Sequence, residues 1–172
     1  MTKTWTEAQR YCRENYTDLA TVNNINDMNE LKKTVNNNQN RSETFVCHEG
    51  ELILIQKNLS WTEAVRYCRE HHVDLVSVDS EKIQRWVTSA VHQASTAEVW
   101  LGLRHSCGLD LWFWVKKEIV CYENWAPGNE TQLNDCSGEH RAGAVQSVGD
   151  HKWISLPRSQ ELNFICTRNK EN

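Results

Sequence analysis

The chain contains one motif twice, and each copy places a cysteine inside a helical pattern. The first copy runs from Trp5 to Val22 and the second from Trp61 to Val78, with 12 of 18 positions identical at a constant offset of 56. In each copy a Thr or Ser precedes a Glu by three residues, which is the pattern of a helix capping box. The repeat predicts two related units, each beginning with a capped helix that carries a cysteine.

The two copies also share an ending but differ greatly in length. Phe45-Val46-Cys47 closes the first copy and Phe164-Ile165-Cys166 closes the second. The helix cysteine and the closing cysteine are 98 residues apart in the second copy and 35 in the first, so the first lacks 63 residues. We therefore predict a truncated remnant over residues 1–48 and a complete domain over 49–169. The remnant has too little core to stand alone, so it packs against the complete copy, stays partly mobile, or reflects a missing exon.

The second copy predicts an α+β fold of two helices followed by antiparallel strands. Its second helix is capped by Ser80 and has an apolar stripe at helical spacing over residues 83–91. The segments that follow are aromatic and β-branched, which is typical of strands. The expected strands are 99–103, 112–115, 119–122, 142–146, 153–156 and 164–166.

Seven dispersed cysteines without a Cys-x-x-Cys pair favour a disulfide framework over a zinc site, and therefore an extracellular protein. Four glycosylation sequons agree with this interpretation; they begin at Asn15, Asn40, Asn58 and Asn129. No signal segment opens the chain, so we expect that its natural start is missing or that the gene model is incomplete. The alternative is a cytosolic protein with reduced thiols.

Charge and hydropathy argue against a nucleic-acid partner and against a membrane-spanning segment. The net charge is −4 with dispersed Lys and Arg, which offers no basic stripe for nucleic acid. No apolar run approaches the roughly 20 residues that span a bilayer, so we expect no membrane segment in this chain.

The second copy resembles the C-type lectin-like domain family. The resemblance covers roughly residues 50–168 and rests on the following motifs in their order along the chain: Trp61-x-x-Ala64-x-x-Tyr67-Cys68, Asp74-Leu75-Val76, Trp100-Leu101-Gly102-Leu103, Trp112-x-Trp114, Asn124-Trp125, Cys136, Trp153 and Phe164-Ile165-Cys166. The strings 124–129 and 153–157 are similar to bony-fish lectin-like proteins related to macrophage mannose-receptor modules. The resemblance implies a disulfide-stapled C-type lectin-like fold.

The resemblance also implies that Cys68 pairs with Cys166, and by the repeat Cys12 should pair with Cys47. The family's second bridge joins a cysteine at the place of Cys136 to one just before the last strand, where this chain has Arg158. Cys107 and Cys121 flank the strand 112–115, and a three-stranded meander would bring them close, so we predict that they pair. Cys136 is then free or joins another chain.

Members of the family that bind sugar do so through calcium, which needs six to eight oxygen ligands. The resemblance implies a Glu-Pro-Asn or Gln-Pro-Asp triplet, which is absent here, and a Glu near the middle cysteine, where this chain has Asn134. Ile154 and Ser155 follow Trp153 in place of the expected Asn and Asp. We therefore expect no cofactor and no metal. The oxygens that remain as weak ligand-binding candidates belong to Asn129, Glu130, Asn134 and Asp135.

No catalytic motif is present, so we do not expect an enzyme. Two functions remain. The first is carbohydrate recognition without the usual calcium site. The second is calcium-independent protein recognition by a receptor or a secreted module. The expected partner is accordingly a glycan or a cell-surface protein. Trp100, Trp125 and Trp153 are expected to pack in the core, and Trp112 and Trp114 to share a strand face opposite Phe113.

Overall fold

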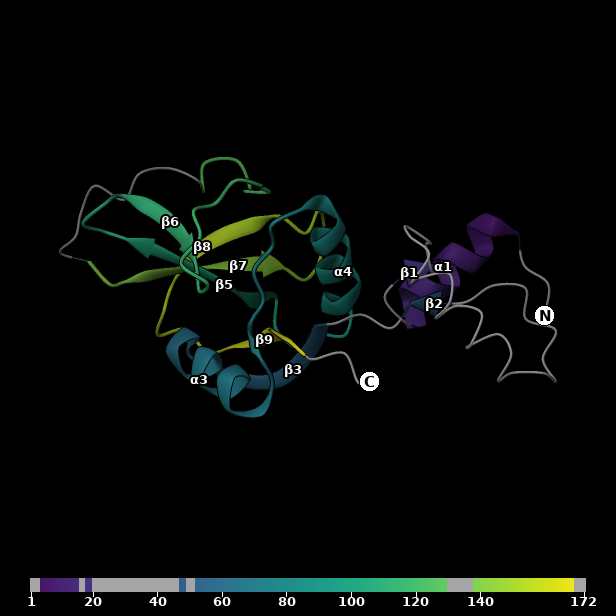
Figure 1. Cartoon of the computed structure of the whole chain (residues 1–172), viewed down its shortest axis with the longest axis horizontal. Coiled ribbons are helices and arrows are strands. Elements are labelled where there is room, and N and C mark those ends of the chain that lie inside the picture. The colour runs from purple at the N-terminus through teal and green to yellow at the C-terminus, as the bar shows by residue number, and fades with distance from the viewer. Residues whose placement is uncertain (1–3, 16–17, 20–46, 49–51, 130–137, 169–172) are drawn as a thin grey trace. The chain divides into compact units, whose positions relative to one another are not determined.

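The computed structural model describes residues 4–15, 18–19, 47–48, 52–129 and 138–168. The chain forms two compact units, Met1–Gly50 and Glu51–Asn172 (Figure 1). Within the described ranges, no helix is both long enough and apolar enough to cross a bilayer.

The first unit contains helix α1 (Trp5–Asn15) and the short strands β1 (Asp18–Leu19) and β2 (Cys47–His48), which pair antiparallel. The expected capping box is confirmed: the Thr4 N–H donates to Glu7 Oε2 at 2.8 Å and the Glu7 N–H donates to Thr4 Oγ1 at 3.3 Å. Ala8 and Cys12, four residues apart, are the buried residues of α1. The helix therefore turns its cysteine inward, as the pattern predicts.

The second unit is a seven-stranded sheet with a helix on each face (Figure 1). Five strands follow the order β3-β9-β5-β7-β8, while β4 pairs with β9 and β6 pairs with β5. Neighbours are antiparallel except β5 and β9, which are parallel. The elements are β3 (Leu52–Leu59), α3 (Trp61–His71), β4 (Asp74–Leu75), α4 (Glu81–Val91), β5 (Glu98–Ser106), β6 (Leu111–Trp114), β7 (Arg141–Gln146), β8 (Trp153–Pro157) and β9 (Leu162–Thr167).

Both helices of this unit begin where the sequence predicts. Ser60 and Glu63 form a complete capping box at α3, and the Ser80 side chain accepts from the Ile83 N–H at α4. The side chains of α3 that face the sheet are Trp61, Ala64, Val65 and Cys68, and those of α4 include Trp86, Val87 and Val91. Each helix thus buries one apolar stripe, because positions three and four apart share a helical face.

The sheet separates two hydrophobic cores. One lies under α3 and contains Trp100, Ala142, Ala144 and Phe164. The other contains Val87 and Val91 of α4 with Val99, Leu101, Val145 and Trp153 of the sheet. Adjacent residues of a strand alternate between these cores, as the pleat requires.

One expected strand does not form in the structure. Residues 119–122 form no regular strand; only an isolated bridge joins Ile119 to Phe113. The segment after α3 pairs with β9 at Asp74 and Leu75, and the N–H groups of Val73 and Val76 donate to the Thr167 and Ile165 carbonyls at 3.0 and 2.9 Å. Val76 and Val78 are buried in the core on the α4 side of the sheet.

Candidate recognition site

Of the predicted ligand-binding residues, Asn129 belongs to the described part of the chain. Glu130, Asn134 and Asp135 lie outside it, so their roles remain predictions. Residues 124–126 run beside β8: the Trp153 N–H donates to the Asn124 carbonyl and the Ala126 N–H to the Trp153 carbonyl, both at 2.8 Å. This short pairing fixes the start of the loop on the sheet edge.

Ser155 is the polar centre of this region. Its backbone N–H donates to Asn129 Oδ1 at 3.3 Å. Its hydroxyl oxygen accepts from Arg141 Nε and its carbonyl oxygen from Arg141 Nη2, each at 2.7 Å. Ser155 stands where the resemblance implies a calcium-binding carboxylate, so a guanidinium group here occupies the neighbourhood that a cation would need. A hydroxyl beside a positive charge does not fit a calcium site.

Sequence reasoning did not find Arg141. It lies at the start of β7, directly before the predicted strand 142–146, and its partner on β8 is 14 residues away. Only the strand register, which pairs Arg141 with Pro157 and Gly143 with Ser155, brings the two side chains together.

Four tryptophans form a continuous aromatic cluster beneath the loop. Trp112 contacts Trp125 with ring centroids 4.7 Å apart, Trp125 contacts Trp153 at 5.6 Å, and Trp153 contacts Trp114 at 5.4 Å. Trp153 is fully buried, and its indole N–H donates to Gln84 Oε1 of α4 at 2.7 Å.

The expected core positions of Trp100 and Trp153 are confirmed, as is the shared face of Trp112 and Trp114. Trp125, expected in the core, is instead half-buried, as is Trp112. Trp112 and Trp125 are therefore the tryptophans of this cluster that retain exposed surface for a ligand.

The comparison with known proteins gives the family. The family model described as the lectin C-type domain matches residues 57–168. The chain belongs to the C-type lectin domain family. The expected fold class, a C-type lectin-like α+β fold, is confirmed. Domains of this family are generally non-enzymatic binding modules.

This C-type lectin domain is similar to several characterised proteins. Rat lithostathine is 26% identical over 135 residues, which cover 73% of this chain and 80% of that protein. Human C-type mannose receptor 2 is 33% identical over 121 residues, covering 66% of this chain but only 8% of the receptor. Among solved structures, CEL-I from Cucumaria echinata superposes with a TM-score of 0.60 at 22% identity, covering 77% of this chain and all of that one.

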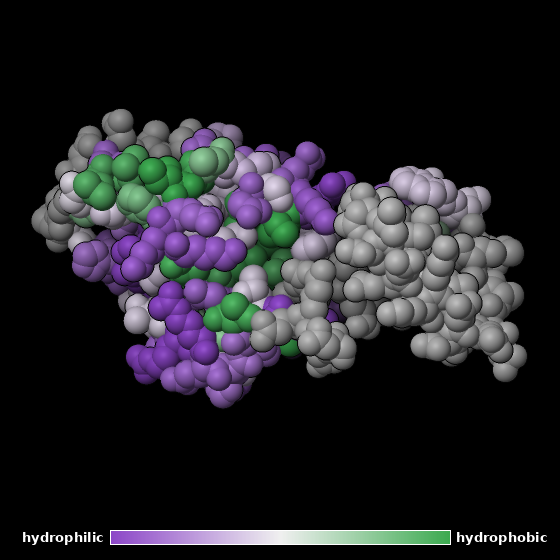
Figure 2. All heavy atoms as spheres, viewed as in Figure 1, coloured by the Kyte–Doolittle hydropathy of each residue, from purple (hydrophilic) through white to green (hydrophobic). Residues whose placement is uncertain are grey.

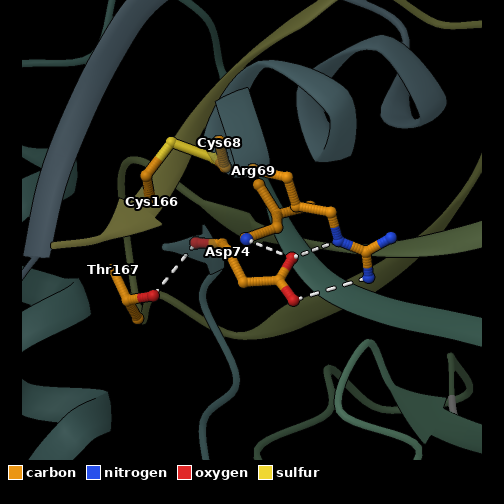
Figure 3. The surroundings of a disulfide bond; sticks show 6 residues. Cys68, Arg69, Asp74, Cys166 and Thr167 are labelled. Carbon is orange, nitrogen blue, oxygen red and sulfur yellow. Dashed lines mark hydrogen bonds and ion pairs between the residues drawn. A yellow bond between two sulfur atoms is a disulfide. The ribbon is translucent and has the colours of Figure 1, made fainter. Parts of the chain in front are cut away.

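The disulfide implied by the resemblance is confirmed in this domain. Cys68 of α3 and Cys166 of β9 are joined, with Cα atoms 5.4 Å apart (Figure 3). Beside them, Arg69 Nε lies 3.2 Å from Asp74 Oδ1, and the Thr167 hydroxyl donates to the Asp74 carbonyl at 3.1 Å. The bridge and these contacts tie α3, β4 and β9 together at one point.

The predicted pairing of Cys107 with Cys121 is wrong. Cys121 is a free, exposed thiol, whereas Cys107 is disulfide-bonded to a cysteine outside the described residues. The expected third strand over residues 119–122 does not form, so no three-stranded meander holds the two cysteines close together. Cys12 is also disulfide-bonded, but the predicted pairing with Cys47 and the state of Cys136 lie outside the described side chains.

The glycosylation sequons differ in their surroundings. Asn58 is exposed on β3, and its Oδ1 accepts from Asn163 Nδ2 at 2.8 Å, which leaves its own amide nitrogen available. Asn129 is half-buried and uses Oδ1 to hold Ser155. The side chains of Asn15 and Asn40 lie outside the described part. Asn58 is therefore the better placed of the two described acceptors.

Proposed function

We propose that this domain is an extracellular recognition module that binds glycans without the calcium ion used by sugar-binding members of its family. The contact of Arg141 with Ser155 supports this proposal most directly. Calcium would have to approach a guanidinium group that donates two 2.7 Å hydrogen bonds at this position. Coulomb repulsion between the two cations opposes that approach.

The surface offered to a sugar consists of Trp112 and Trp125 with the polar groups of Asn129 and Arg141. Aromatic rings give rigid apolar area against which a sugar ring can stack, and the polar groups set its orientation. The extracellular location is supported by the disulfides and by relatives that are receptors by name.

Calcium binding is tested most simply by thermal unfolding. A ligand present at 100 times its dissociation constant stabilises a protein by about 2.7 kcal/mol. We expect the midpoint temperature of unfolding to be the same in millimolar calcium as in the presence of a chelator. A clear rise with calcium would contradict the proposal.

Glycan binding is tested on a glycan array, with and without the chelator. We expect binding that the chelator does not alter and that Arg141→Gln weakens by about tenfold, since hydrogen bonds to a charged group contribute roughly 1.5–3 kcal/mol. Arg85→Gln, on the exposed side of α4, is the matched control. Chelator-sensitive binding would refute calcium independence, and binding to no glycan would favour the alternative, calcium-independent recognition of a protein.

A further inference from the structure

A row of side chains crosses the sheet on the face that carries α3. The register pairs Leu156 with Ala142, Ala142 with Arg104, Arg104 with Phe113, and Phe113 with Ile119. Directly opposed residues of neighbouring strands share a face of the sheet. We call these five residues, on β8, β7, β5, β6 and the segment after β6, the Arg104 row.

The β6 end of this row is an exposed apolar surface. Ile119 is 59% exposed and Leu111 is 44% exposed. Leu111 lies two residues before Phe113 on β6 and therefore on the same face of the sheet. Hydrophobic residues gather over β6 and are bordered by hydrophilic ones between β6 and α3 (Figure 2). Ala142 is fully buried in the core under α3 and Leu156 packs against that core. The open part of the row is therefore Arg104, Phe113 and Ile119, which do not belong to that core.

Arg104 is the only charged residue of the row, and a second arginine lies nearby. Burial, and then the charge of Arg104, lower the pKa of Arg158. Arg158 lies over the Trp61 ring at 4.7 Å, and its Nε donates to the Arg141 carbonyl at 3.4 Å. Among the residues that the structure describes, the ion pairs are Arg69–Asp74 and His105–Asp110, so neither arginine is neutralised by a carboxylate there.

We propose that the open part of the Arg104 row, together with Leu111, is a docking surface for a partner protein, which contributes an acidic side chain flanked by aliphatic ones. The carboxylate would pair with Arg104, and the aliphatic groups would cover Phe113, Leu111 and Ile119. Arginine and aromatic side chains are the groups that most often dominate protein interfaces. An exposed apolar patch beside unpaired positive charge therefore fits such a partner in both polarity and charge.

Two other occupants fit the row less well. A second copy of this chain, joined by a twofold axis, would bring its own Arg104 towards this one, and like charges oppose that contact. A glycan would offer few apolar groups to Leu111 and Ile119. The row also lies on the opposite face from Arg141, because Arg141 and Ala142 are adjacent on β7. This inference is therefore independent of the proposed glycan site.

A random eight-residue peptide library displayed on phage, selected against the full chain, tests the proposal. We expect the recovered sequences to contain Asp or Glu flanked by Leu, Ile or Val. The consensus peptide, synthesised and measured by fluorescence anisotropy, should bind at least about tenfold more weakly to Arg104→Gln and to Ile119→Asp. Replacing its acidic residue by the corresponding amide should weaken binding to the unaltered chain by a similar factor.

Matched substitutions outside the row serve as controls. Arg85→Gln removes an exposed arginine on α4, and Val148→Asp places a charge at a residue that is 71% exposed. Both should leave peptide binding unchanged. The proposal is overturned if selection yields no acidic-aliphatic consensus, if the row variants bind as the controls do, or if sedimentation shows a dimer that Ile119→Asp dissociates.

Discussion

Gly102 lies in β5, where the end of β4 and the residue after β6 approach its backbone closely. A Cβ added there would lie 2.8 Å from the carbonyl oxygens of Leu75 and Val76 and 2.9 Å from a methyl of Val115. The Gly102 N–H donates to the Val76 carbonyl at 2.7 Å, so the strand cannot move away without losing that bond. We expect Gly102→Ala to destabilise the domain by about 1–3 kcal/mol, the usual cost of overpacking. Urea unfolding followed by tryptophan fluorescence measures this loss in the free energy of unfolding.

Gly108 is the control at the same scale. It lies in the turn between β5 and β6, where a Cβ would meet no atom within 4 Å. Gly108→Ala should therefore leave the free energy of unfolding nearly unchanged. If both variants lost the same free energy of unfolding, the close contacts at Gly102 would not be the reason for a glycine at that position.

At the residue scale, the sequence predicts what depends on near neighbours and misses what depends on distant ones. Ser60, Glu63 and Cys68 could be assigned because capping and helical periodicity act within a few residues. Arg141 could not, since its partner is set by the register of β7 with β8. Cys121 was misassigned because the pattern of residues 119–122 predicts a strand that the structure does not form.

At the scale of the element, the capping box at the start of helix α3 leads to a prediction about stability. The Ser60 backbone N–H and hydroxyl donate to Glu63 Oε2 at 3.0 and 2.7 Å, and the Glu63 N–H donates back to the Ser60 hydroxyl oxygen at 3.4 Å. Loss of such a cap in Ser60→Ala should cost about 1 kcal/mol in the free energy of unfolding. Thr62→Ala, exposed in the same turn, should cost nothing, because alanine is the better helix former.

The cap also gives this destabilisation a pH dependence. The hydrogen bonds from the Ser60 side chain and backbone hold the pKa of Glu63 below its usual value. A carboxyl group with a lowered pKa stabilises the folded state fully above its unfolded pKa, about 4.3, and loses that contribution as the pH falls through the folded value. The difference between Ser60→Ala and the unaltered chain should therefore be larger at neutral pH than at strongly acidic pH. A pH-independent difference would contradict this account.

Element by element, periodicity predicted the helices and most strands but not how the strands are ordered. Nothing local signals that β9 lies between β3 and β5, or that β5 runs parallel to it. Those choices depend on which faces must be buried together, and the Cys68–Cys166 bridge is the sequence feature that most restricts them.

At the scale of the whole molecule, the sequence repeat has a counterpart in the strand pairing of the two units. Leu19 pairs with Cys47 and Asp18 with His48 in the first unit; Leu75 pairs with Cys166 and Asp74 with Thr167 in the second. Each pairing joins the segment after the helix to the segment with the closing cysteine. That the first unit is a truncated copy stays a prediction, and this shared register supports it.

The first unit should depend on its disulfide more strongly than the second. An isolated helix of 11 residues is marginal in water, and units of this size usually need a covalent link or a partner. Cys12 is buried and disulfide-bonded. In Cys12→Ser, we expect hydrogen exchange to show lost amide protection across Trp5–Asn15, while β5 and β7 keep theirs because they belong to a separate compact unit.

Cys121→Ser is the matched control, because this thiol is free and exposed, and it should change protection in neither unit. Two results would refute the expectation for Cys12→Ser. If α1 stayed protected, packing and not the disulfide would hold the helix in place. If β5 and β7 lost protection together with α1, the two units would unfold as one, and the second would depend on the first for its stability.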